Sequence, residues 1–228
     1  MSKKIFITGT GTDVGKTYVS GLIVKKMLES GRSAGYYKAA MSGNERRADG
    51  LLIPGDAVHV KNISGTGQSV TQMCPYVYEH AVSPHLASRL EGNPVCMEVV
   101  EKGFQEVCSQ YDYVTMEGSG GILCPVCFDE EKIWLEDVIK RLNLSCLLVA
   151  DAGLGTINSV VLTVEYMKSR QIPVRGIIYN HFHPGNVMEE DNVLMCEYMT
   201  GLKTLACVQD KDTELAMDGE LLASLYEE

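Results

Sequence analysis

Nine consecutive residues near the N-terminus have the composition of a phosphate-binding loop. The run Gly9–Thr17 reads GTGTDVGKT. Its Gly15-Lys16-Thr17 end matches the phosphate-loop pattern, and its glycine-rich start matches it loosely. In such loops backbone N–H groups converge on phosphate oxygens, the lysine reaches the β- and γ-phosphates, and the threonine hydroxyl can ligate Mg²⁺. We therefore predict a nucleoside triphosphate site here, in preference to a tight turn with an exposed lysine.

A second glycine-rich segment supplies a carboxylate. In Asp112–Gly121 (DYVTMEGSGG) a strand pattern ends in Glu117 and is followed by glycines. This places Glu117 at the carboxyl edge of a sheet, where ligands bind in open α/β folds. Mg²⁺ needs one or two carboxylates beside the phosphates, so Glu117 is a candidate ligand, with an exposed acid in a turn as the alternative. Asp56 is a weaker candidate, because alone it is more often a helix N-cap.

Two further segments are candidates for binding anions. Lys38 follows a predicted strand and would reach the same phosphates from the side opposite Lys16, although such a lysine is more often a solvated surface residue. Asp151–Asn158 forms a second glycine-rich turn between a predicted strand and a predicted helix. Helix N-termini attract carboxylates as well as phosphates. A simple connection explains this turn equally well.

Other residues with metal-binding side chains lack the spacing of metal sites. Cys124 and Cys127 form a Cys-x-x-Cys pair, but a structural zinc site normally needs a second ligand pair, which the sequence lacks. His181 and His183 fit no ligand pattern and are interpreted as loop residues. We expect neither zinc binding nor redox chemistry at these positions.

Alternating strand and helix patterns surround these motifs. Buried strands are predicted at 4–8, 34–37, 113–116, 146–150 and 174–179, with a weaker one at 205–208. Helices are predicted at 18–29, 97–108, 133–142, 157–167 and 193–199, and loops with short helices at 48–82. This alternation predicts an α/β fold with a mostly parallel central sheet and helices on both faces. Because no repeat or Pro/Ser linker appears, residues 1–228 are expected to form a single domain.

Composition and charge limit the functional class. The 228 residues are 45% hydrophobic and 22% charged, as in ordinary globular proteins. Lys and Arg number 20 and Asp and Glu 30, and the net charge of −10 disfavours unspecific binding to nucleic acid or anionic membranes. No apolar run approaches the length of a membrane span, and the stretch before Gly9 is too short for a signal peptide. We expect a cytoplasmic protein with eight reduced cysteines, and with neither nucleic acid nor membrane as a partner.

Taken in order, the motifs resemble the dethiobiotin synthetase family, the ATP-dependent ring-closing enzymes of biotin synthesis. The resemblance covers about residues 3–180, and the combination of motifs is more specific than the phosphate loop alone. It is carried by GTGTDVGKT, Lys38 with Ser42-Gly43, Gly55-Asp56-Ala57, Ser83-Pro84-His85, EGSGG from Glu117, and Gly155 with Asn158. It implies a single-domain phosphate-loop NTPase fold.

The resemblance implies roles for individual residues. Lys38 and Lys16 would be the catalytic residues. Those implied to bind the nucleotide are Thr12, Asp13, Val14, Gly15, Lys16, Thr17, Tyr18, Asp56, Glu117, Gly118, Ser119, Gly120 and Asn180, of which Asn180 matches the position that reads adenine. Those implied to hold Mg²⁺ are Thr17, Asp56 and Glu117, and those implied to bind the diamine substrate are Ser42, Gly155, Thr156 and Asn158. Family members are homodimers, in which the 155–158 turn would bind the substrate carboxylate beside the partner subunit's phosphates.

The implied reaction joins 7,8-diaminononanoate, CO₂ or bicarbonate, and ATP. A carbamate on one amine attacks the γ-phosphate, and the second amine then closes the carbamic-phosphoric anhydride into a ureido ring, releasing ADP and phosphate. Such a reaction depends on positioning and charge neutralisation, for which two lysines and Mg²⁺ are suited. Residues 204–214 lack the loop that borders the base in the family, so the choice of nucleobase is left open.

Other functions are consistent with a phosphate loop. A related amidoligase generally carries a glutaminase domain, for which the chain after Asn180 is too short. A partition-type ATPase switch has a further lysine near the start of the loop, where this sequence has Gly11. A nucleotide-binding domain of unassigned output is the third alternative.

Overall fold

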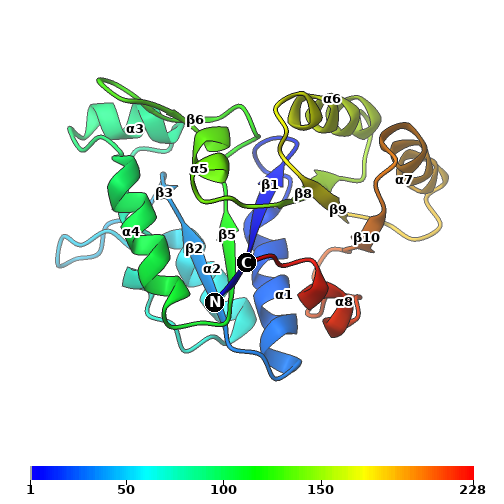
Figure 1. Ribbon diagram of the computed structural model, residues 1–228, viewed down its shortest axis with the longest axis horizontal. Helices are drawn as coiled ribbons and strands as arrows, with labels where there is room; N and C mark the ends of the chain where they lie inside the picture. The colour runs from blue at the N-terminus through cyan, green and yellow to red at the C-terminus, as the bar shows by residue number, and fades with distance from the viewer. Residues whose placement is uncertain (1) are drawn as a thin grey trace.

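A six-stranded parallel sheet forms the centre of the computed structural model, which describes residues 2–228 (Figure 1). The strand order is β10-β9-β8-β1-β5-β2, and every neighbouring pair is parallel. The strands are β1 (Lys3–Gly9), β2 (Ala34–Lys38), β5 (Tyr113–Glu117), β8 (Cys146–Asp151), β9 (Val174–Asn180) and β10 (Thr204–Cys207). All six predicted strands are present, and the predicted α/β fold is confirmed.

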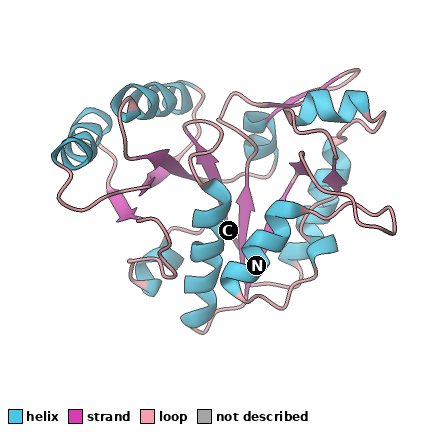
Figure 2. Ribbon diagram, turned by 180° about the vertical axis from the view of Figure 1, so that it is seen from behind, coloured by secondary structure: helices cyan, strands magenta, loops and turns pink. Residues whose placement is uncertain are grey.

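Helices pack on both faces of this sheet, as Figure 2 shows from behind. They are α1 (Lys16–Glu29), α2 (Gly55–Ser64), α3 (Pro84–Leu90), α4 (Met97–Cys108), α5 (Leu135–Arg141), α6 (Thr156–Ser169), α7 (Val187–Thr200) and α8 (Gly219–Ser224). Side chains alternate between the faces: Ile5 and Ile7 pack in the cluster with α1 and α2, whereas Phe6 packs in the cluster with α4 and α5. Among the described residues, no helix combines the length and apolar character needed to cross a membrane.

The sequence patterns missed several short elements. Besides α3 and α8, these are two small sheets, formed by β3 (Ala40–Met41) with β4 (Tyr76–Val77) and by β6 (Pro125–Phe128) with β7 (Lys132–Trp134). The short helices expected within 48–82 are α2 and η1 (Val70–Gln72). The helix predicted from residue 133 begins only at Leu135, because β7 pairs antiparallel with β6. Helix α7 begins at Val187 rather than at 193. The Asn186 side chain caps this earlier start by accepting the Met188 N–H. Such short elements depend on tertiary pairing more than on local periodicity.

Glycines begin the two helices that follow the glycine-rich turns. Gly15 precedes α1 with φ 84°, and Gly155 precedes α6 with φ 91°. Both conformations are left-handed, which favours glycine. At Gly15 a Cβ would also lie 2.0 Å from Asn180 Nδ2. The phosphate loop is therefore packed directly against the end of β9.

Candidate active site

A cavity of about 630 Å³ opens at the carboxyl edge of the sheet, between the loop after β1 and the beginning of α2. It is lined by Thr12, Asp13, Gly15, Lys16, Thr17, Tyr18, Lys38, Met41, Ser42, Gly55, Asp56, His59, Glu117, Ser119 and Gly120. These residues come from distant parts of the sequence, and the parallel strands bring them together because their carboxyl ends share one edge. The volume lies in the range typical of small-molecule sites.

Glu117 is the centre of a hydrogen-bond network in this cavity. The register of β2 and β5 places Lys38 opposite Glu117. Lys38 Nζ lies 2.6 Å from Glu117 Oε1 and 2.7 Å from Asp56 Oδ2. Thr17 Oγ1 donates to the same Glu117 oxygen at 2.8 Å. The three predicted metal ligands and the predicted catalytic lysine therefore lie in one contiguous group.

The charges of Lys38 and Asp56 depend on each other. Burial by itself would lower the pKa of the Lys38 ammonium, but Glu117 and Asp56 together raise it above its ordinary value. Burial also opposes ionisation of Asp56, but the charge and hydrogen bond of Lys38 lower the pKa of that carboxyl. Lys38 is therefore a buried cation held between acidic side chains.

Lys16 has the opposite electrostatic environment. Its Nζ donates to the carbonyl of Gly11 at 2.7 Å, so the side chain folds along its own loop. Burial lowers the pKa of the Lys16 ammonium, and the positive charge of Lys38 lowers it further. An anion bound in the loop would offset both effects, because its negative charge would favour the ammonium form. The site is thus suited to a polyanionic ligand.

Tyr36 is a functional candidate that the sequence analysis missed. Its hydroxyl donates to Glu117 Oε2 at 2.9 Å, and the side chain is fully buried. Burial and the Glu117 charge raise the pKa of Tyr36 well above its ordinary value, so the hydroxyl remains a donor. Its position two residues before Lys38 on a strand was the available signal, since such residues share one face. His59 was also missed, and it follows Asp56 by three residues on α2.

Some predicted nucleotide-binding residues do not line the cavity. Val14 is buried, and Gly118 packs against Phe6, whose ring would lie 2.9 Å from an added Cβ. Asn180 lies against the phosphate loop, where its Nδ2 donates to the carbonyl of Val14 at 3.3 Å. Its Oδ1 is buried and has no hydrogen-bond partner among residues 2–228. Asn180 therefore offers an unused acceptor beside the loop.

The predicted substrate-binding residues divide into two groups. Ser42 lines the large cavity. Gly155 and Asn158 instead line a separate, mostly apolar cavity of about 440 Å³ between α6 and α7, and Thr156 is buried. Within one chain the structure does not bring these three residues to the phosphate loop.

The Cys-x-x-Cys segment contributes one thiol near the site. The Cys124 Sγ would lie 3.4 Å from a Cβ on Gly120, and burial raises the pKa of this thiol. All eight cysteines are free. Because a raised pKa reduces the thiolate fraction, Cys124 is a poor nucleophile and a poor metal ligand.

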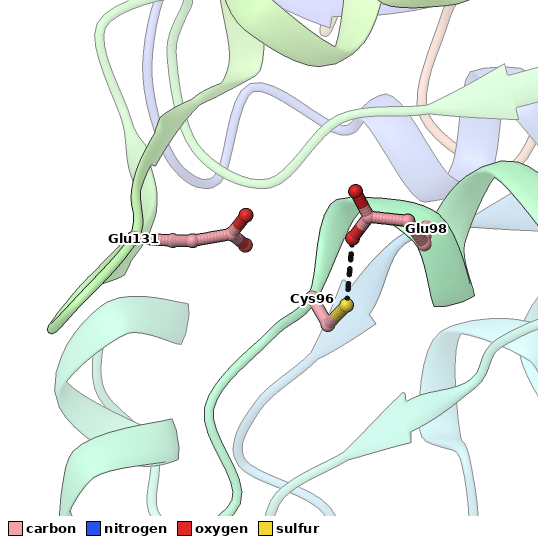
Figure 3. Close-up of side chains that lie close together, drawn as sticks. All are labelled: Cys96, Glu98 and Glu131. Atoms are coloured by element: carbon pink, nitrogen blue, oxygen red, sulfur yellow. Dashed lines mark hydrogen bonds between the residues drawn. The ribbon is translucent and has the colours of Figure 1, made fainter.

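A second group of potential metal ligands lies elsewhere on the surface (Figure 3). Cys96, Glu98 and Glu131 place one ligand atom each within 4.8 Å of the others. Cys96 Sγ donates to Glu98 Oε2 at 2.9 Å, and this hydrogen bond lowers the pKa of Glu98. The contact uses a protonated thiol, whereas metal binding requires the thiolate. We assign no metal to this group.

Comparisons with known proteins give the family model and the fold that this chain resembles. A family model described as an AAA domain matches residues 3–214. A ParA family ATPase from Chlorobium tepidum TLS superposes with a TM-score of 0.58 at 12% identity, over 93% of this chain and 86% of that one. At that identity the likeness shows the fold alone, which is that of a phosphate-loop NTPase.

Two curated relatives are much more similar in sequence. An ATP-dependent dethiobiotin synthetase of Brachyspira hyodysenteriae is 48% identical over 228 residues, covering 100% of both chains. An enzyme of the same name from Clostridium perfringens is 46% identical over 227 residues, covering 99% of both. Full-length identity of this order, together with the phosphate loop and the Lys38–Glu117 pair, shows that the chain belongs to the family of ATP-dependent dethiobiotin synthetases.

Proposed function

We propose that this protein uses ATP to close the ureido ring of dethiobiotin from 7,8-diaminononanoate and CO₂. The observation that carries the proposal is the pair of lysines that line one cavity, Lys16 from the beginning of α1 and Lys38 from the end of β2, with Lys38 held between Asp56 and Glu117. Phosphoryl transfer to a carbamate needs such cations on either side of the reacting group. Lys16 would bind the β- and γ-phosphates, and Lys38 would meet the γ-phosphoryl group.

Thr17, Asp56 and Glu117 would hold Mg²⁺. Their hydroxyl and carboxylate oxygens are the hard ligands that this ion prefers, and two of them already hold a cation, the Lys38 ammonium. When bound, the ion would neutralise charge on the β- and γ-phosphate oxygens. A magnesium ion bound by Asp56 and Glu117 would also release Lys38, because the ion and the Lys38 ammonium compete for the same two carboxylates.

The remaining small-molecule contacts divide between two subunits. Ser42 would contact the diamine within the cavity, and the 155–158 turn would bind its carboxylate in the partner subunit's site. Exposed apolar side chains on and before α6 and on α7 support a second copy as the occupant of this surface, among them Leu154, Leu162 and Tyr198, which are 91%, 62% and 83% exposed. We therefore propose a cytoplasmic homodimer whose subunits each form one domain over residues 1–228.

Phosphate release tests the proposed reaction directly. We expect release from ATP only when both diaminononanoate and bicarbonate are present, with one phosphate released per ureido ring formed. Hydrolysis without the diamine would instead favour a partition-type switch. Stimulation by a carboxylic acid with glutamine or ammonia would favour an amidoligase.

Replacing one metal ligand should change the requirement for magnesium. In Glu117→Gln we expect the half-saturating Mg²⁺ concentration to rise at least about tenfold, because a neutral amide is a poorer ligand for a hard cation. The matched control is Tyr36→Phe, which removes the hydrogen bond to Glu117 but leaves the carboxylate charge in place. Magnesium titrations of turnover measure both variants. An unchanged magnesium requirement in Glu117→Gln would contradict a direct metal contact.

Subunit mixing tests the shared site. Asn158→Ala should raise the KM for the diamine while leaving that for ATP nearly unchanged. Mixing it with an inactive Lys38→Ala protein should restore activity, because each heterodimer would contain one site with both residues intact. Turnover at low diamine concentration, after subunit exchange verified with a tagged protomer, measures this. Absence of recovery would exclude a site built from two subunits.

A further inference from the structure

His181 and Asp151 form a hydrogen-bonded pair that was not anticipated from the sequence. Asp151 ends β8, directly opposite Asn180 at the end of β9. His181 follows with φ 54°, and its Nδ1 lies 2.7 Å from Asp151 Oδ2. Asp151 Oδ1 accepts the N–H of Gly153 at 2.7 Å. Each carboxylate oxygen therefore has its own donor.

This pair fixes which imidazole nitrogen carries the proton. A carboxylate only accepts hydrogen bonds, so His181 Nδ1 must donate to Asp151. In the neutral ring Nε2 is then an acceptor, and Asn180 Nδ2 donates to it at 3.1 Å. The same Nδ2 donates to the carbonyl of Val14. Two acceptors thus face the amide nitrogen of Asn180.

The consequence is a fixed orientation of the Asn180 amide. With the nitrogen committed to two acceptors, Oδ1 is the atom that stays without a partner, although it is buried. A buried carbonyl oxygen favours a ligand that donates a hydrogen bond and disfavours one that presents another carbonyl. Adenine carries an exocyclic amino group at the position where hypoxanthine carries a carbonyl.

We infer that His181 and Asp151 are positioning residues that set the nucleobase preference, because they commit the Asn180 nitrogen and leave its oxygen, beside the phosphate loop, as the acceptor for an exocyclic amino group. This inference rests on the proposed function in one respect, namely that Asn180 reads the base. Residues 204–214 lack the loop that borders the base in the family, and the His181–Asp151 pair provides another physical basis for base selectivity. Because neither His181 nor Asp151 lines the cavity at the phosphate loop, their effect should be on base choice and not on triphosphate binding as such.

The test compares ATP with ITP, which differ at this position of the base. Dissociation constants from calorimetry should favour ATP by at least about tenfold in the unaltered protein. In Asp151→Asn, Oδ1 still accepts the Gly153 N–H, so the new amide nitrogen faces His181 Nδ1 and shifts the imidazole proton to Nε2. That proton opposes Asn180 Nδ2, and the ATP-to-ITP ratio should fall toward one. If the pair had a purely structural role, the variant would weaken the binding of ATP and of ITP by the same factor.

Two further variants make the outcome decisive. His181→Asn keeps a residue that tolerates positive φ but removes the ring, and it should also lower the ratio. His183→Asn changes the neighbouring imidazole, which contacts Glu189, and should leave the ratio unchanged. Thermal unfolding checks that each variant is folded.

Asn180→Ala separates this inference from the proposed role of Asn180. If it abolishes the preference while Asp151→Asn and His181→Asn retain it, the inference is wrong and the base contact stands. If it leaves the preference intact, the base is read elsewhere. A protein that binds ATP and ITP equally well would also overturn the inference.

Discussion

Replacing Lys38 with methionine should lower kcat by a factor of about 10² to 10³, the usual cost of losing one preorganised electrostatic contact. Methionine keeps the long unbranched stem and removes only the charge. The ammonium would stabilise negative charge that develops as the carbamate oxygen attacks, so its loss should affect kcat more than the KM for ATP. Steady-state kinetics with saturating diamine and bicarbonate measure both constants.

Stability has to be followed in the same variant. Removing Lys38 leaves Glu117 and Asp56 without their cation, and breaking a buried ion pair typically costs about 3–5 kcal/mol. We therefore expect a lower Tm that recovers partly with Mg²⁺, and activity should be measured well below that Tm. Lys140→Met is the matched control, because Lys140 is half-exposed and its one ion pair within residues 2–228 is with Glu136 on its own helix. Normal turnover in Lys38→Met would refute the proposed mechanism.

Replacing Lys16 with alanine should instead abolish tight nucleotide binding. Each charge-assisted hydrogen bond to phosphate is worth about 1.5–3 kcal/mol, so the Kd for ATP should rise by about 10² or more. Calorimetric titration with ATP in the presence of Mg²⁺ measures the change. Unaltered affinity would remove the phosphate-loop assignment.

The fold should tolerate this change. Burial lowers the pKa of Lys16 and Lys38 lowers it further, so the unliganded protein holds this ammonium in an unfavourable environment. Alanine removes both costs but also the hydrogen bond to the Gly11 carbonyl, so we expect a Tm without nucleotide close to that of the unaltered protein. Lys26→Ala, near the other end of the same helix, should change neither property. The two lysines would therefore differ in effect: replacing Lys16 would mainly raise the Kd for ATP, and replacing Lys38 would mainly lower kcat.

Local patterns were sufficient for the main elements of the fold. Strands such as Cys146–Asp151 are continuous apolar runs, and helices such as Met97–Cys108 have an apolar face, so each can be predicted from neighbouring residues alone. The hairpin of β6 and β7 was missed because its strands are short and each is stabilised by the other. Helix α7 was predicted too short, since its first turns carry few apolar side chains and begin at the Asn186 cap.

The sequence by itself determined the phosphate loop, the Glu117 carboxylate at the end of a strand and the α/β class, because each depends on residues close together in the chain. Only the tertiary structure decided which side chains meet. The register of β2 with β5 sets Lys38 opposite Glu117, and the end of β8 beside β9 joins Asp151 to His181. The tertiary structure also places Asn158 in a different cavity from the phosphate loop of its own chain. Such contacts join residues many positions apart, and their geometry is fixed only when the strands pair, so no local pattern encodes them.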